Sequence, residues 1–192
     1  MFDYTNYIDD YLEESLSVAK KQKDLANKVF DISKEFINCI EKKGKIIVFG
    51  NGGSASDSLH IVAELIGRFK KERRALPAIS LSSNVSVITA IANDFGYENV
   101  FSKQIEGIHS ENDIVFAIST SGESENVIKA LEYSKQIGLK TVGFTGSKKN
   151  KMIELCDLIL RAPSDTPALV QQCHITLGQL ICGIVEDHFF RD

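Results

Sequence analysis

Two short segments rich in glycine and hydroxyl residues are the parts of this sequence best suited to chemistry. Gly50-Asn51-Gly52-Gly53-Ser54 follows a run of apolar residues, and Ser119-Thr120-Ser121-Gly122-Glu123-Ser124 follows a second apolar run. A helical pattern comes after each segment. Where a strand ends in such a turn and a helix begins, free backbone N–H groups and the positive end of the helix dipole can bind a phosphate or carboxylate. The two segments together predict a site for a phosphorylated small molecule.

Other phosphate-binding motifs fit these segments poorly. The pattern Gly50-x-Gly52-x-x-Ala55 matches the dinucleotide-binding fingerprint in form. That fingerprint requires an acidic residue at the end of the next strand, and the next predicted strand runs instead into residues 82–84, Ser-Ser-Asn. A P-loop requires Gly-Lys-Ser/Thr after the glycines, and that sequence is missing. We therefore expect no nucleotide cofactor.

Each of these residues also has a purely structural interpretation. Ser54 and Ser124 could be helix caps, each contributing ~1 kcal/mol, and Gly122 could be a turn residue. Matched positions after two strands favour a functional interpretation of the set. The helical pattern after the first turn adds His60 and Glu64, which are four residues apart and hence on one helix face. A base and a proton donor so close to a phosphate site suit proton transfer on a phosphosugar, although an exposed His–Glu pair is the alternative.

The elements that must position these residues form an alternating pattern. The first 43 residues predict two amphipathic helices. Strands are expected at 45–49, 78–81, 113–118, 140–144 and 157–161, and helices at 54–67, 85–108 with a break near 93–96, 124–137, 150–155 and 166–189. This alternation predicts an α/β fold with a doubly wound, parallel, five-stranded sheet. We expect one domain over 1–192, with N-terminal helices at 1–43, the α/β core at 44–165 and a long C-terminal helix at 166–190.

Composition excludes several classes of function. A formal net charge of −4 gives no electrostatic footprint for nucleic acid or an anionic membrane. No apolar run approaches the ~20 residues of a membrane span, and the N-terminus is unlike a signal peptide. The four cysteines, Cys39, Cys156, Cys173 and Cys182, lack paired metal-type spacing and are expected to be reduced core thiols. We expect a cytoplasmic protein without nucleic-acid or membrane partners, whose additional helices make subunit contacts.

Three motifs in their order carry a family resemblance. They are Gly50–Ser54, the segment Asn93-Asp94-Phe95-Gly96-Tyr97, and Ile118–Ser124. With them the chain resembles sugar-isomerase (SIS) domain proteins and, over essentially its whole length, the bacterial phosphoheptose isomerase family. The resemblance implies an aldose–ketose isomerase that converts sedoheptulose 7-phosphate to D-glycero-D-manno-heptose 7-phosphate through an enediol. It also implies a role in heptose and lipopolysaccharide biosynthesis, and a homotetramer with sites at subunit interfaces.

The resemblance also assigns roles to residues of this chain. It makes Glu64 the catalytic base, and His60, Glu64, Gln171 and Gln179 the positions that match zinc ligands, one ion per subunit. We expect the phosphate to lie near Gly52 and Gly53 on Ser54, Ser119, Thr120, Ser121 and Ser124, with Asn51, Asn93, Asp94 and Gln171 orienting sugar hydroxyls. Gln179 departs from the family, which has a histidine that serves in acid–base catalysis there. Glutamine is a poorer zinc ligand than imidazole and cannot transfer protons at neutral pH, so zinc and full catalytic competence are left open.

Two other functions follow from the same pattern. Some relatives of this fold are non-catalytic tetramers that bind the bacterial replication initiator, and others are phosphosugar-sensing regulatory domains. An intact phosphate loop and Glu64 favour the enzyme. The basic run from Arg68 to Arg74 could hold substrate phosphate across a subunit boundary, but a solvated loop is the favoured interpretation. For His174, packing is favoured over a ligand role.

Overall fold

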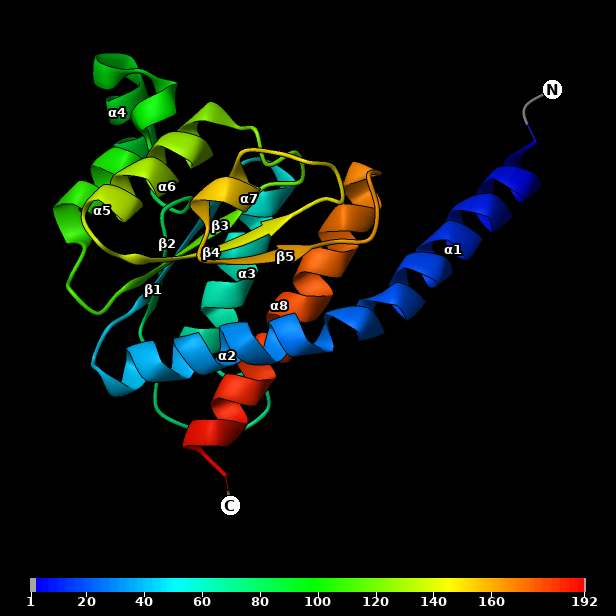
Figure 1. The fold of residues 1–192 in the computed structure, drawn as a ribbon, viewed down its shortest axis with the longest axis horizontal. Coiled ribbons are helices and arrows are strands. Elements are labelled where there is room, and N and C mark those ends of the chain that lie inside the picture. The colour runs from blue at the N-terminus through cyan, green and yellow to red at the C-terminus, as the bar shows by residue number, and fades with distance from the viewer. Residues whose placement is uncertain (1–2, 192) are drawn as a thin grey trace.

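Five parallel strands form the centre of the molecule. The computed structural model describes residues 3–191 (Figure 1). The strands are β1 (Ile46–Gly50), β2 (Ala78–Ser80), β3 (Ile114–Ile118), β4 (Lys140–Thr145) and β5 (Leu158–Arg161), in the order β2-β1-β3-β4-β5. All neighbouring strands are parallel. The chain order reverses between β1 and β3, and in such sheets ligands bind beyond the carboxyl ends of the strands at the reversal.

Helices cover both faces of the sheet, as the sequence predicted. One face carries α2 (Ala26–Glu41), α3 (Gly53–Ile66) and α8 (Pro167–Phe189), and the other carries α4 (Val85–Phe95), α5 (Ser102–Ile108), α6 (Glu125–Gln136) and α7 (Met152–Leu155). Alternate strand residues face opposite layers because strand side chains have a period of two. Ile46 and Val48 therefore pack with the first set of helices, whereas Ile47 and Phe49 pack with the second.

The predicted break in the fourth helical segment lies at Gly96. This residue has φ +89°, a conformation that L side chains rarely adopt, and it ends α4. A short 3₁₀ helix, η2 (Tyr97–Asn99), follows before α5 begins. The break turns the chain so that Tyr97 approaches the end of β1, where it donates a hydrogen bond to Asn51.

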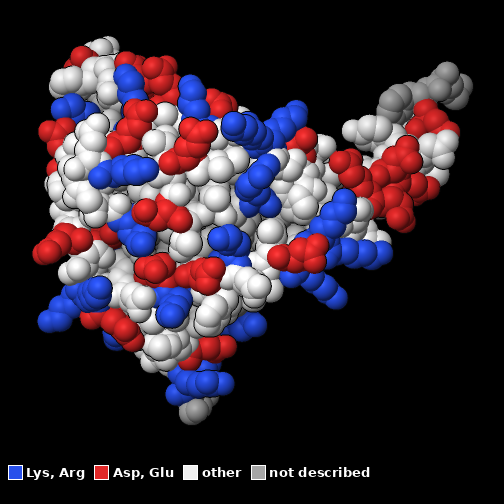
Figure 2. Space-filling view, in the orientation of Figure 1, with Lys and Arg blue, Asp and Glu red and all other residues white. Residues whose placement is uncertain are grey.

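The N-terminal helix α1 (Tyr4–Lys21) leaves the body of the molecule as an arm (Figure 1). It is joined to α2 by the 3₁₀ helix η1 (Gln22–Leu25) and leaves Ile8, Leu12 and Leu16 exposed. Figure 2 shows acidic side chains gathered on this arm, while acidic and basic side chains are interspersed over the face of the body in view. An amphipathic helix with an uncovered apolar stripe is typical of a subunit contact.

The long C-terminal helix belongs to the core. By length and composition alone α8 could cross a membrane, and it is the one helix of residues 3–191 that could. Ten of its residues are buried, among them Val170, Cys173, Leu177 and Ile181. Its apolar character is therefore explained by packing against α2, α3 and the sheet. The four cysteines are free thiols, and burial raises the pKa of each to about 12, so they are unreactive.

Candidate active site

The two glycine- and hydroxyl-rich turns leave the sheet side by side. Gly50, the last residue of β1, is in register with Ile118, the last residue of β3. A Cβ on Gly50 would lie 2.6 Å from the carbonyl oxygen of Ile118 and 2.7 Å from the Cβ of Ser54. Only glycine fits between the neighbouring strand and the helix that follows. The close approach brings the starts of α3 and α6 to the point of strand reversal.

The first turn presents the start of α3 to this point. Gly52, with φ +56°, is the N-cap residue, so Ser54 lies inside the first turn and is not the cap. Ser54 is 3% exposed. Gln171, from the start of α8, covers Gly53: a Cβ added there would lie 2.4 Å from Gln171 Nε2. The structure thus brings Ser54 and Gln171 together at the amino end of α3.

The second turn is a loop of hydroxyl groups. The Ser119 hydroxyl lies 3.4 Å from those of Ser121 and Ser124 and accepts the N–H of Gly122 at 3.1 Å. Gly122 has φ +65°, and a Cβ there would collide with the buried Asn150. Ser124 is the N-cap residue of α6, yet its side chain makes no capping hydrogen bond. Its hydroxyl faces Ser119 instead, so the capping interpretation does not account for it.

Amide groups connect the two turns. Asn51 exchanges two hydrogen bonds with Asn126 of α6, at 2.8 and 3.0 Å, and accepts a third from the Tyr97 hydroxyl at 2.9 Å. Asn126 and Tyr97 were not predicted from the sequence. Asn93 and Asp94 lie exposed near the end of α4 and are hydrogen-bonded to each other at 2.8 Å. Tyr97, three residues after Asp94, contacts the first turn through its hydrogen bond to Asn51.

Two lysines that the sequence analysis missed also belong to this region. Lys148 and Lys149 line a hollow of about 330 Å³ together with Thr120 and Ser121. Both follow β4, whose carboxyl end lies beside that of β3. The hollow is also lined by Glu123, Asp165 and Pro167. The run Ser-Lys-Lys-Asn-Lys, which begins three residues after the strand predicted at 140–144, was the available signal.

The predicted proton-transfer residues form a second group on α3 and α8. His60 Nε2 lies 3.1 Å from Glu64 Oε1, and Gln179 Nε2 donates to the same carboxylate oxygen at 3.2 Å. Gln179 Nε2 also lies 3.3 Å from His60 Nε2. The side chain of His60 is 51% exposed and that of Glu64 17% exposed, so the carboxylate is partly shielded from water but remains accessible. The sequence predicted that His60 and Glu64 share a face, and their contact confirms it.

The two groups are well separated within one chain. Glu64 follows Ser54 by ten residues, which at the rise of an α-helix is about 15 Å along α3. Gln179 follows Gln171 by eight residues, about 12 Å along α8. Gln171 therefore lies with the two glycine- and hydroxyl-rich turns, whereas Gln179 lies with His60 and Glu64. The predicted site residues therefore form two clusters in the single chain.

Two further titratable residues, Asp57 and His174, lie on α3 and α8. Burial raises the pKa of Asp57 to about 6, partly offset by His60, and its Oδ2 is buried without a hydrogen-bond partner. Asp57 lies three residues before His60 and seven before Glu64, on the same side of α3. Burial lowers the pKa of His174 to about 4, against the hydrogen bond from its Nε2 to the Thr145 carbonyl. His174 is thus a neutral packing residue at neutral pH, as the sequence analysis favoured.

The side chains near Glu64 supply only part of a zinc-ligand set. His60 and Glu64 supply an imidazole and a carboxylate, both good zinc ligands, but Gln179 supplies only an amide oxygen. Gln171 points to Gly53 and does not join them. Residues 3–191 contain no group of three or more His, Cys, Asp or Glu side chains that could hold a metal ion. The residues of one chain therefore do not complete a catalytic zinc site.

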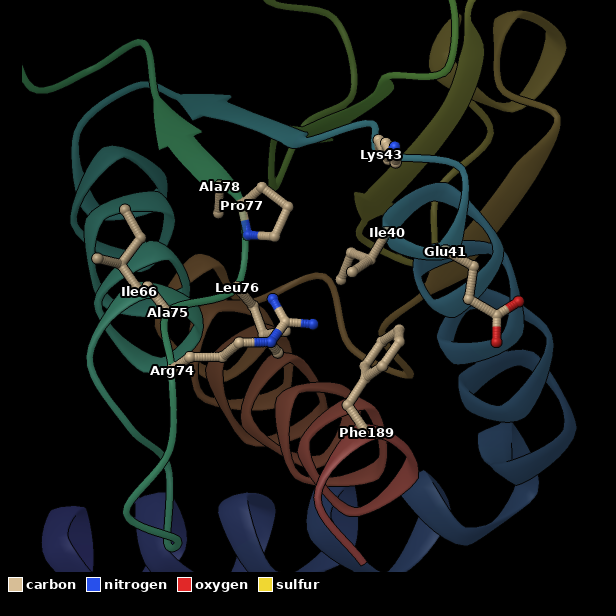
Figure 3. A pocket seen from close by; sticks show the side chains of 10 residues that line it. All are labelled: Ile40, Glu41, Lys43, Ile66, Arg74, Ala75, Leu76, Pro77, Ala78 and Phe189. Atoms are coloured by element: carbon tan, nitrogen blue, oxygen red, sulfur yellow. The ribbon is translucent and has the colours of Figure 1, made fainter.

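A larger hollow, of about 730 Å³, lies away from the two turns, beside the end of α3 at Ile66 (Figure 3). It is lined by the end of α2, by Phe189 of α8 and by the segment Arg74–Ala78, which leads into the start of β2. Parallel sheets bind their ligands at the opposite, carboxyl ends of the strands. None of the predicted site residues lines it. We therefore place the candidate site at the β1/β3 turns and not in this hollow.

The fold and the two turns define a class of protein. A doubly wound sheet whose β1 and β3 end in adjacent hydroxyl-rich turns is a sugar-isomerase domain, and the family model described as "SIS domain" matches residues 5–146. The phosphoheptose isomerase of Nitratiruptor sp. is 43% identical over 180 residues, which is 94% of this chain and 96% of that protein. The chain belongs to the phosphoheptose isomerase family.

Solved structures agree with this assignment. The phosphoheptose isomerase from Francisella tularensis has a TM-score of 0.93 and 31% identity, over 97% of this chain and 100% of that chain. The phosphoheptose isomerase from Neisseria gonorrhoeae has a TM-score of 0.91 and 30% identity, over 96% of this chain and 100% of that chain.

Proposed function

We propose that this protein is a sedoheptulose 7-phosphate isomerase, which forms D-glycero-D-manno-heptose 7-phosphate for heptose and cell-surface polysaccharide biosynthesis. The observation that carries the proposal is that this member of the phosphoheptose isomerase family has two kinds of site. One is a hydroxyl-lined turn pair at the β1/β3 reversal, and the other is a carboxylate held by an imidazole and an amide. The first suits a phosphate, and the second suits proton transfer between adjacent carbons.

In this proposal Glu64 moves the proton. Its carboxylate removes a proton from C1 of the ketose, which leaves an enediolate, and returns that proton to C2 to form the aldose. The second proton moves from the C1 hydroxyl to the C2 oxygen, so no electrons leave the substrate. The Gln179 amide, 3.2 Å from Glu64, can donate a hydrogen bond to the developing oxyanion but cannot supply a proton. His60, which contacts Glu64, is the group that can exchange the second proton.

The phosphate would be bound at the other cluster. Hydroxyl groups of Ser54, Ser119, Thr120, Ser121 and Ser124 and the amino ends of α3 and α6 supply donors without bulk. Lys148 and Lys149 add positive charge at the edge of the hollow beside Thr120. Asn51, fixed by Asn126 and Tyr97, and Gln171 would orient the sugar hydroxyls.

The distance between the two clusters supports a site shared by two subunits. Eight bonds separate C1 of the sugar from its phosphorus, so an extended heptose phosphate spans about 10 Å, judged from the reach of an extended chain. The start of α3 and Glu64 are about 15 Å apart along the same helix. Ten residues also rotate the helix by about 1000°, which leaves Ser54 and Glu64 about 80° apart around the helix axis. One substrate can use both clusters if Glu64 acts on sugar bound in a partner's turns.

Exposed apolar side chains around the second cluster support the same conclusion. Leu59 and Ile66 on α3 and Leu180 on α8 are each 43–48% exposed, and they flank His60, Glu64 and Gln179. Such residues on one surface are typical of a subunit contact. From these exposed residues and the arm α1, we propose a homotetramer whose active sites lie between subunits. Zinc, with one ion per subunit, would require a ligand beyond those of one chain.

The non-catalytic alternative, a tetramer that binds the replication initiator, is not favoured. It predicts loss of the catalytic carboxylate, whereas Glu64 is present and in contact with His60. The curated relative and the two solved structures described above carry the name phosphoheptose isomerase.

The test of Glu64 uses a substitution that keeps the shape of the side chain. Glu64→Gln should abolish turnover of sedoheptulose 7-phosphate, by at least about 100-fold, because general-base catalysis contributes 10² or more. Binding of the phosphosugar, measured by calorimetry, should persist. Glu132→Gln, on the exposed side of α6, is the matched control and should behave as the parent protein. Turnover by Glu64→Gln within tenfold of the parent would exclude Glu64 as the base.

A further inference from the structure

The loop between α3 and β2 contains a buried arginine within its basic run. The expectation that this run is a solvated loop is wrong for Arg73, whose side chain is 1% exposed. Its Nε donates to Oε2 of Glu186 on α8 at 2.9 Å, and the Glu186 side chain is also 1% exposed. The neighbouring Arg74 is exposed and lines the hollow of Figure 3. The two adjacent arginines therefore have different roles.

Glu186 fastens the loop to α8. Its carboxylate accepts the backbone N–H groups of Phe69, Lys70 and Lys71 at 2.7–2.9 Å, in addition to Arg73. Burial by itself raises the pKa of the Glu186 carboxyl, but these four donors hold the pKa below its ordinary value. A buried charge with this many partners is costly to leave unpaired, so the arrangement is held firmly.

Arg73 also binds the carboxyl end of α3, and so connects it to Glu186. Its Nη2 donates to the carbonyl oxygen of Glu64 at 2.7 Å, and its Nη1 donates to those of Leu65 and Gly67 at 2.7 and 3.0 Å. The last carbonyl groups of a helix have no partner within the helix, and the planar guanidinium fork can satisfy several at once. The backbone of Glu64 is thus tied through Arg73 to Glu186.

The contacts made by Arg73 and Glu186 lie beside the proposed proton-transfer cluster on α3 and α8. Glu186 follows Gln179 by seven residues, about two helical turns, so both lie on the same side of α8. Gln179 on this side of α8 contacts the carboxylate of Glu64 directly. Glu186 reaches the backbone carbonyl of Glu64 indirectly, through Arg73. We propose that Arg73 and Glu186 are positioning residues that hold the Glu64 carboxylate in the geometry required for proton transfer. The inference rests on the proposed role of Glu64.

The experiment separates positioning from binding. In Arg73→Met, kcat should fall at least tenfold because small displacements of a reacting group are costly. KM, and inhibition by inorganic phosphate, should stay within twofold because the phosphate-binding turns lie at the far end of α3. Glu186→Gln should lower kcat in the same way. Arg73→Lys, which keeps the charge but not the fork, should recover part of kcat. Arg74→Met is the matched control, since Arg73 and Arg74 both lie over the Phe190 ring, and it should leave kcat and KM unchanged.

Several results would overturn the proposal. An unchanged kcat in folded Arg73→Met is one, and a rise in KM that accounts for the whole loss of activity is another. If Arg73→Met does not fold, Glu186→Gln decides by the same criteria. If the parent protein has no turnover, the proposed function fails, and positioning is then tested by NMR of the His60 imidazole, which contacts Glu64. Its signals should shift in the Arg73 and Glu186 variants and not in Arg74→Met, and unmoved signals would overturn the inference.

Discussion

Mixing two inactive variants tests whether the active site is shared between subunits. One variant, Glu64→Gln, lacks the proposed base, and the other, Ser119→Ala with Ser124→Ala, lacks two hydroxyls of the phosphate-binding loop. If one site combines Glu64 of one chain with the loop of another, a mixed oligomer restores intact sites. With random assembly from equal amounts, each site has a probability of one half for an intact Glu64 and one half for an intact loop. About a quarter of the parent activity should therefore return.

The expected recovery follows from the 15 Å that separate the start of α3 from Glu64, against about 10 Å for the substrate. The two variants should be co-expressed with different affinity tags and purified on both, and turnover of sedoheptulose 7-phosphate should be measured per subunit. A mixture of Glu64→Gln with a chain that carries all three substitutions is the control and should stay inactive. If the first mixture is no more active than its parents, both clusters of one chain act on the same substrate, and the argument from distance is wrong.

Three further predictions concern single sites. Because burial lowers the pKa of His174 to about 4 from 6.5, the unfolded state binds a proton that the folded state excludes, and stability falls as the pH drops below about 6.5. The loss of unfolding free energy approaches about 3 kcal/mol near pH 4, since one pKa unit is ~1.4 kcal/mol. Urea unfolding at pH 7 and at pH 4.5 should show a smaller loss in His174→Gln than in the parent protein. Equal losses in the two proteins would contradict the burial argument. Gln179→His should raise zinc affinity at least tenfold, measured by competition with a chelator, because it adds an imidazole beside His60 and Glu64; an unchanged affinity would mean that the cluster cannot hold the ion. Lys148→Gln with Lys149→Gln should raise KM severalfold and weaken its dependence on salt while kcat stays near the parent value; an unchanged KM would remove both lysines from the phosphate site.

The fold could be predicted because its signals are local. The apolar run before Gly50 and the helical spacing after Ser54 are set by burial, which the sequence pattern records directly. The break near Gly96 was predicted for the same reason, since a positive φ requires glycine in most contexts. The contact between His60 and Glu64 follows from helical spacing alone. Where both partners lie on one element, the sequence was sufficient.

The relations between distant elements could not be predicted in this way. Gln179 reaches Glu64 only because α8 packs beside α3, and Arg73 is buried only because Glu186, 113 residues later, faces it. A run of charged residues normally predicts exposure, and tertiary packing reversed that prediction at one position. The 15 Å between Ser54 and Glu64 could have been counted from the sequence, but its consequence depends on where Gln171 and Gln179 lie.

The most direct test of the proposed function is turnover of sedoheptulose 7-phosphate by the purified protein, with fructose 6-phosphate as control. The assay should follow formation of the heptose product by a coupled or NMR readout, after metal removal and again with added zinc. The account predicts conversion of the heptulose phosphate and little or none of the hexose phosphate, with Glu64→Gln inactive. No conversion in either metal state, by a folded protein that still binds the heptulose phosphate, would contradict it and favour a non-catalytic binding protein.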